Sequence, residues 1–148
     1  MSYKDIPTIE PEDLKDMTVG KTVGDLMVSG NKIPFVQEKI KMKNALKILI
    51  KKGLGVLIIK NNKNITTGIL TDGDLKRSNR KFKNFDDIKI KSIMKKNPKS
   101  VNKDMLATES LYIMNKNKIT SLCVHDGKKK NKTIGIITVH ALLSANIR

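Results

Sequence analysis

A hydroxyl and a carboxylate three positions apart are the side chains best suited to chemistry in this chain. Thr71 ends a short apolar run, and Gly73 and Asp74 follow it at the start of a polar segment. A carboxylate can accept hydrogen bonds from both hydroxyls of a ribose, while a threonine and the free N–H groups of a helix start can donate to a phosphate. The pattern is typical of a nucleotide site. The same spacing also describes a capping box, which only satisfies the end of a helix, so both interpretations stay open.

The segment that carries this pair occurs twice. Residues 68–75 read GILTDGDL, and residues 135–142 read GIITVHAL. The second copy keeps the hydroxyl as Thr138 but has Ala141 where the first copy has Asp74. The repeat unit is longer than that of a solenoid, so it indicates two compact halves with a cleft between them, a common place for a small ligand. Only the first half is then equipped to hold a ribose.

The elements that must position these residues follow one order in both halves: helix, strand, helix, strand, strand, helix. Helices are predicted where apolar residues recur with helical spacing, and buried strands where they are continuous. In the first half we expect a short helix at 22–27, an edge strand at 33–36, a helix at 42–50, strands at 56–59 and around 69–70, and a helix at 73–80. In the second half we expect a short helix at 92–94, a helix at 107–114, strands at 122–124 and 134–138, and a helix at 139–145.

The chain divides accordingly into an N-terminal arm or linker (1–21), a first repeat (22–81), a linker (82–87) and a second repeat (88–148). Gly53 follows the last turn of a helix, where a left-handed cap suits glycine. The linker contains Phe82 and Phe85, which we expect to be exposed. The buried face of the 42–50 helix is predicted to consist of Met42, Ala45, Leu46, Leu49 and Ile50.

The net charge of +16 over 148 residues allows two interpretations. One is a nucleic-acid-binding protein that neutralises phosphates. The other is compositional: the cations are lysines except at positions 77, 80 and 148, and they are scattered along the chain rather than gathered on one face. Aromatic residues make up only 3%, which supplies few stacking surfaces for bases. We favour the compositional interpretation and regard nucleic acid as an unlikely partner, although the charge should attract an anionic small ligand.

The sequence offers little support for an enzyme. The histidines are His125 and His140 and the cysteine is Cys123, so neither a catalytic triad nor a metal site can be nominated. No phosphate-binding glycine loop occurs. Cys123 lies in an apolar strand and is predicted to be a buried, inert thiol. No apolar stretch is long enough to span a membrane and the N-terminus does not resemble a secretion signal, so we expect a cytoplasmic protein.

The ordered repeat resembles a pair of CBS domains, also called a Bateman module. The strings GNKIP (30–34), KGLG (52–55) and TDGDLKR (71–77) resemble more narrowly the CBS pair of bacterial arabinose-5-phosphate isomerases, enzymes of the Kdo branch of lipopolysaccharide synthesis. The resemblance implies an α+β fold in which a β-α-β-β-α unit occurs twice with pseudo-two-fold symmetry. It also implies two packed sheets flanked by helices, and a homodimer formed through those helices.

The resemblance further implies that the clefts between the repeats bind an adenine nucleotide or a nucleotide-sugar, with no cofactor required. By the family pattern the ligand-binding residues are Thr71 and Asp74 for phosphate and ribose, Ile33, Pro34, Gly55 and Val56 near the base, and Thr138 in the second copy. The sequence departs from the pattern at Ala141, and also at Asn31 and Lys76, where the subgroup often has an acid and an arginine.

The leading hypothesis is a regulatory, ligand-sensing module that acts on a sugar-phosphate isomerase or another enzyme. Only about 20 residues precede the repeats where the isomerases carry their sugar-isomerase domain, so we expect no isomerase activity from this chain. The alternatives are a basic nucleic-acid-binding protein and a structural dimerisation module whose clefts are degenerate.

Overall fold

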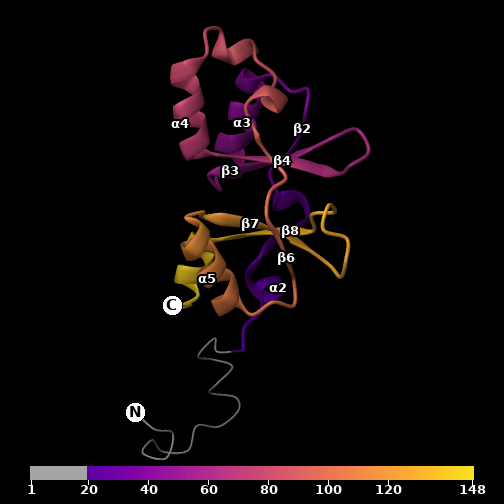
Figure 1. The fold of residues 1–148 in the computed structure, drawn as a ribbon, viewed down its shortest axis with the longest axis vertical. Helices are drawn as coiled ribbons and strands as arrows, with labels where there is room; N and C mark the ends of the chain where they lie inside the picture. Colours follow the sequence, from indigo (N-terminus) through magenta and orange to yellow (C-terminus); the bar gives the residue numbers. More distant parts are fainter. Residues whose placement is uncertain (1–19) are drawn as a thin grey trace, which may run out of the picture.

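Two four-stranded sheets lie face to face, and each carries helices on its outer side (Figure 1). The computed structural model describes residues 20–148, so the arm or linker expected at 1–21 lies almost entirely outside the described residues. The first half contains α2 (Val23–Leu26), β1 (Val28–Ser29), a 3₁₀ turn (Gly30–Lys32), β2 (Phe35–Gln37), α3 (Met42–Lys52), β3 (Val56–Lys60), β4 (Thr66–Thr71) and α4 (Asp72–Lys81). The second half contains 3₁₀ turns (Phe85–Asp87 and Ile90–Ser92), β5 (Lys95–Lys96), β6 (Ser100–Asn102), α5 (Ala107–Asn117), β7 (Ser121–His125), β8 (Gly135–Thr138) and α6 (Val139–Ser144). The expected α+β fold of two tandem repeats is confirmed.

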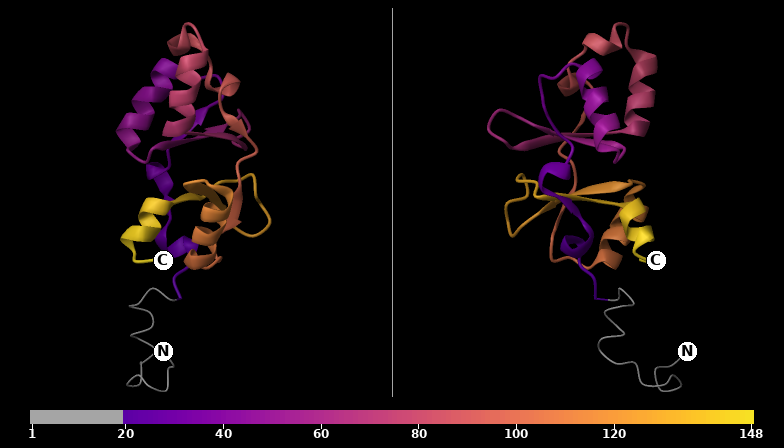
Figure 2. Two further views of the ribbon diagram at one scale, coloured as in Figure 1. Left: turned by 60° about the vertical axis from the view of Figure 1, so that its left-hand side comes forward. Right: turned by 180° about the vertical axis from the view of Figure 1, so that it is seen from behind.

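Each sheet is completed by a strand from the other half of the sequence. The strand orders are β2-β3-β4-β5 and β1-β8-β7-β6. Strand β1 pairs antiparallel with β8, with Val28 opposite Ile136, and β5 pairs antiparallel with β4, with Lys95 opposite Ile69. The two views in Figure 2 show the chain crossing between the sheets at both places. These exchanged strands join the halves by main-chain hydrogen bonds in both directions.

Two glycines make the exchange possible. A Cβ at Gly68 would lie 2.3 Å from Sδ of Met94, and a Cβ at Gly135 would lie 2.4 Å from Sδ of Met27. Each methionine immediately precedes the exchanged strand and packs across the partner sheet. The glycine that is repeated in GILT and GIIT therefore leaves room for the methionine that is repeated in the other half: Gly68 for Met94, and Gly135 for Met27.

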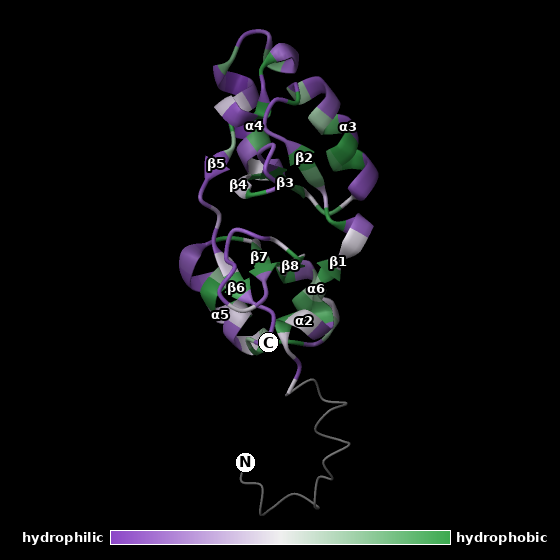
Figure 3. Cartoon of the chain, turned by 90° about the vertical axis from the view of Figure 1, so that its right-hand side faces the viewer, coloured by the Kyte–Doolittle hydropathy of each residue, from purple (hydrophilic) through white to green (hydrophobic). Residues whose placement is uncertain are grey.

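The central strands bury both of their faces, because successive strand residues point to opposite sides. In β3, Leu57 and Ile59 pack in the outer core beneath the helices, while Val56 and Ile58 face the other sheet. Cys123 of β7 lies in the same layer between the sheets and is 1% exposed. Figure 3 shows hydrophobic residues concentrated in these strands. The continuous apolar runs in the sequence were therefore correctly predicted as buried strands.

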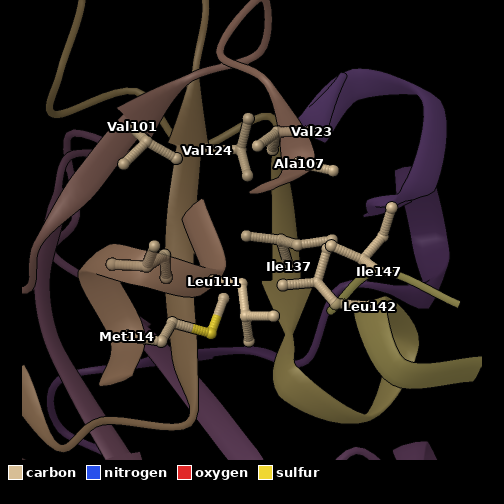
Figure 4. Packing of buried hydrophobic residues seen from close by; sticks show 10 residues of the cluster. Val23, Val101, Ala107, Leu111, Met114, Val124, Ile137, Leu142 and Ile147 are labelled. Carbon is tan, nitrogen blue, oxygen red and sulfur yellow. The ribbon is translucent and has the colours of Figure 1, made fainter. Parts of the chain in front are cut away.

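The outer core of the second half also shows the exchange. Figure 4 shows Val23 of α2 packed with Val124, Ile137 and Leu142, so a residue from the start of the chain lies in the core of its last elements. Burying each side chain of this size contributes about 1.5–3 kcal/mol.

Ile50 and Phe85 contradict the sequence prediction. Ile50 is 80% exposed, because it follows Leu49 by about 100° around the helix axis and turns away from the sheet. Phe85 is 9% exposed and packs in the core beneath α3, because Asn84 has a left-handed conformation (φ 55°) that redirects the chain. Phe82 is 41% exposed, as expected. The short helix expected at 92–94 is instead the 3₁₀ turn at Ile90–Ser92.

Candidate functional site

The Thr-x-x-Asp pair forms a complete capping box at the junction of β4 and α4. The N–H of Asp74 donates to Oγ1 of Thr71 at 3.3 Å, and the N–H of Thr71 donates to Oδ2 of Asp74 at 3.1 Å. The hydroxyl of Thr71 also donates to Oδ2 at 2.9 Å. Local structure therefore gives Asp74 a capping role at the start of α4.

Asp74 also has contacts that a cap does not need. Its Oδ1 accepts a hydrogen bond from Arg77 at 2.6 Å and lies 3.2 Å from Nζ of Lys95. The carboxylate is 6% exposed, whereas the side chains of Arg77 and Lys95 are 65% and 63% exposed. Burial raises the pKa of Asp74, but the hydrogen bonds from Thr71, Arg77 and Lys95 outweigh it and leave the pKa below its ordinary value. Asp74 is thus an ionised, buried acceptor, and Lys95 ties it to the second half.

Asp74 lies in the wall of a cleft of about 620 Å³ formed by both halves. The first half contributes the start of α4 and two apolar residues, Leu54 and Ile69. The second half contributes β5 with the segment that follows it (95–99) and the end of α5 with the residues leading into β7 (117–121). A volume of this size is typical of small-molecule sites, and a few polar groups among apolar ones is their usual composition.

The corresponding place in the second copy is smaller and lacks an acid. Thr138 accepts a hydrogen bond from the N–H of Ala141 at 3.1 Å and so caps α6, but nothing in this cap reproduces the carboxylate of Asp74. The cavity beside it has about 200 Å³ and is lined by Gly53–Val56, Thr120, Ser121, Thr138 and His140. The two sites implied by the repeat are therefore unequal.

The structure brings some of the predicted site residues together and separates others. Thr71, Asp74 and Gly55 line the large cleft. Val56 and Thr138 line the small cavity instead, with Gly55 between the two. Ile33 is buried in the layer between the sheets, and Pro34 beside it is also buried.

Lining residues that the sequence did not suggest come from both halves: Leu54, Ile69 and Arg77 from the first, and residues 95–99 and 117–121 from the second. Asn97 and Pro98 line the large cleft, where their counterparts at the start of the first half had been expected. The strand exchange explains the difference, because β5 carries the following residues to the first sheet. The repeat could have indicated these two residues, because Asn97-Pro98 is the second-half counterpart of the segment that contains Pro34.

Cys123 and His125 of β7 do not line the large cleft. Burial raises the pKa of the Cys123 thiol to about 11, and burial together with Lys130 lowers the pKa of His125. His125 shares a hydrogen bond with Ser100 through Nδ1. Among residues 20–148, no cluster of three acidic, histidine or cysteine side chains has the arrangement of a metal site. Within the same part of the chain, no helix combines the length and hydrophobicity needed to cross a membrane.

A comparison with known families identifies the repeated unit. The model of the CBS domain matches residues 23–80 and again residues 90–148. The chain belongs to the CBS domain family. Its two halves are tandem CBS domains, and the cleft described above lies between them.

Curated relatives of this CBS pair include arabinose 5-phosphate isomerases. The isomerase KdsD of Francisella tularensis is 33% identical over 147 residues, which is 99% of this chain and 44% of the relative. KdsD of Escherichia coli K12 is 32% identical over 84% of this chain and 37% of the relative. The chain is thus homologous to the C-terminal CBS region of these isomerases and spans about two fifths of their length.

Solved structures show the same fold. CBSX2 in complex with AMP has a TM-score of 0.73 and 23% identity, covering 86% of this chain and 96% of its own. The CBS pair of MJ0100, in complex with 5′-methylthioadenosine and S-adenosylmethionine, has a TM-score of 0.73 and 22% identity, covering 84% and 94%.

Proposed function

We propose that this CBS pair is a regulatory module that binds an adenine nucleotide or a nucleotide-sugar in the large cleft. The observation that carries the proposal is the buried, ionised carboxylate of Asp74 in the wall of a cleft built by both repeats. The two solved relatives named above hold adenine-containing ligands, which supports this ligand class. The proposed site combines Thr71, Asp74 and Gly55, with Asn97 and Pro98 from the second repeat.

Ligand binding would rearrange the contacts of Asp74. Hydroxyl groups of a ribose would donate to the carboxylate and take the place of Arg77 or Lys95. Both cations have well-exposed side chains, so they can move into water or toward a phosphate at small cost. Each hydrogen bond to the charged oxygen contributes about 1.5–3 kcal/mol.

The arrangement suggests how binding would be transmitted. The walls of the cleft come from α4 of the first repeat and from β5 and α5 of the second. A ligand that contacts both walls favours one relative orientation of the repeats, and an attached or associated enzyme can respond to that population. A sugar-phosphate isomerase is the partner suggested by the relatives. The role proposed for this chain is regulatory rather than catalytic.

The helices supply a surface for a second copy of the chain. Side chains exposed on or beside them are Ile50 of α3, Leu106 before α5, Tyr112 of α5 and Leu143 of α6. Phe82, at the end of α4, is exposed as well. Association through the helices would remove such side chains from water. We therefore propose a homodimer through the helices, which light scattering of the wild type and of Ile50→Ser would test.

The experiment that tests ligand binding compares two capping boxes in one chain. Thr22 and Asp25 at the start of α2 form the same cap as Thr71 and Asp74, with Oδ2 of Asp25 2.9 Å from the N–H of Thr22, but Asp25 is exposed. Calorimetric titration with AMP, ATP, S-adenosylmethionine and a cytidine-linked sugar should give binding by the wild type and by Asp25→Asn. Asp74→Asn should lose it.

Three outcomes would count against the proposal. No binding by the folded wild type would favour a dimerisation module, and equal binding by Asp74→Asn would place the ligand elsewhere. If the protein binds RNA or DNA with an affinity that falls steeply with salt, and Asp74→Asn binds equally well, the nucleic-acid alternative is favoured.

A further inference from the structure

The large cleft carries more positive charge than its own acids can balance. Its lining includes five cations (Arg77, Lys95, Lys96, Lys99 and Lys118) and two carboxylates (Asp72 and Asp74). Arg77 and Lys95 are both paired with Asp74. Among residues 20–148, no salt bridge involves Lys96, Lys99 or Lys118. The surplus charge therefore lies on the wall that the second repeat contributes.

The wall contributed by the first repeat is different. Helix α4 begins there, and a helix start ordinarily attracts a phosphate. Here Asp72 and Asp74 already occupy its first turn. The start of α4 therefore offers little net positive charge to a phosphate, because the two acids offset the helix dipole and the nearby cations Arg77 and Lys95 are paired with Asp74. The lysines on the other wall would attract a ligand with several negative groups.

Lys118 holds a backbone conformation that disfavours lysine. It caps α5 in the left-handed region, with φ 55° and ψ 42°, and its N–H donates to the carbonyls of Asn115 and Met114. At the equivalent end of α3 the chain has Gly53, with φ 69°. Every other left-handed position in residues 20–148 is a glycine or an asparagine: Gly30, Gly53, Gly55, Gly127, Asn64, Asn84, Asn97 and Asn146.

A side chain at this conformation costs stability relative to glycine, because Cβ crowds the following carbonyl. The sequence uses the residues that tolerate this region at all the other positions. The exception lies in the lining of the cleft, on the wall with surplus charge. Conformational strain of this kind is commonly retained where the side chain has a function.

We propose that Lys118 is a specificity-determining residue that, with Lys99 and Lys96, selects a nucleoside di- or triphosphate over the monophosphate and the nucleoside. The inference rests on the nucleotide site proposed above and deepens it. The ribose binds at Asp74, and the outer phosphates lie against the second-repeat wall. Lysine suits this task because its compact charge neutralises a phosphate without demanding a fixed bidentate geometry.

The test uses the backbone strain as an internal control. Lys118→Gly removes the charge and relieves the left-handed conformation, so its melting temperature should rise while its affinity for ATP and ADP falls by about tenfold or more. Its affinity for adenosine should not change. Lys118→Asn, which also tolerates this conformation, should lose ATP affinity to the same extent. Lys128→Gln removes the same charge from an exposed loop outside the cleft and should bind ATP like the wild type.

The results separate this inference from the proposed function. Binding by the wild type of ATP, AMP and adenosine with equal affinity, lost in Asp74→Asn, would leave the nucleotide site standing and overturn the role of Lys118. If Lys118→Gly and Lys128→Gln lower the affinity for ATP equally, the effect comes from net charge alone, and the role proposed for Lys118 is also overturned. Failure of the wild type to bind any of the three would overturn the role of Lys118, and failure to bind S-adenosylmethionine and the cytidine-linked sugar as well would also overturn the proposed function.

Discussion

Replacement of Asp74 by alanine should destabilise the protein even without ligand. The change makes the first cap resemble the second, which has Ala141 at this place. It removes the acceptor for the Thr71 N–H and hydroxyl, which costs about 1 kcal/mol as a lost cap. Loss of the buried, charge-assisted bonds at Oδ1 adds about 1–2 kcal/mol, because Arg77 and Lys95 are exposed and become hydrated. The total is about 2–3 kcal/mol.

The matched variant is Asp25→Ala, which removes an exposed cap of the same geometry. It should cost only about 0.5–1 kcal/mol. Urea unfolding of the three proteins at neutral pH, without nucleotide, measures both differences. If Asp74→Ala lowers the free energy of unfolding no more than Asp25→Ala does, the contacts of Asp74 with Arg77 and Lys95 contribute nothing to stability. The ion pair between Asp74 of the first repeat and Lys95 of the second would then not stabilise the fold.

The difference between wild type and Asp74→Ala should also depend on pH. The pKa of Asp74 is lower in the folded protein than its ordinary value of 3.8, which the unfolded chain retains. Its stabilisation is therefore complete above that value and is lost as the pH falls through the folded pKa. Unfolding curves at pH 7 and pH 3 should show the gap between the two proteins narrowing at the lower pH. A gap that stays constant would show that charge does not matter at this position.

Three further outcomes follow from the fold. Gly68→Ala should cost about 1–3 kcal/mol in urea unfolding, because its Cβ would meet Sδ of Met94, and Met94→Ala in the same chain should recover part of the loss. The thiol of Cys123, with its pKa raised to about 11 by burial, should react with a thiol reagent at pH 8 only in denaturant; fast labelling of the native protein would contradict this burial. Because the pKa of His125 lies below its ordinary 6.5 in the folded state, the unfolded chain binds the proton first. Stability should therefore fall as the pH drops below 6.5, and His125→Gln should flatten that part of the stability curve.

Local patterns in the sequence were sufficient for most of the secondary structure. Val56–Ile59 is a buried strand because a continuous apolar run needs both faces covered, and Gly53 ends α3 because a left-handed cap suits glycine. Ile50 was wrongly placed because apolar identity alone does not give the angle around a helix. Phe85 was wrongly placed because its burial depends on the backbone of Asn84, which sequence periodicity does not report.

The cleft was less predictable than the elements that form it. The pair Thr71 and Asp74 could be identified from spacing, and Arg77 lies one helical turn after Asp74. Lys95 and Lys118 could not be identified, because their approach depends on β5 leaving its own half and on the end of α5 facing α4. Tertiary pairing, rather than local sequence, determines which cations meet the carboxylate.

The crossing of β1 and β5 has a consequence for the origin and dissection of the molecule. A half produced alone would expose one unpaired sheet edge and carry one strand with nothing to pair with, so we expect it to associate with another copy of itself. The strand exchange within the present chain resembles that of a swapped dimer, and residues 82–87, expected as the linker, would be the tether between its halves. Cleaving that tether in the folded protein should leave two fragments that stay interlocked through their exchanged edges.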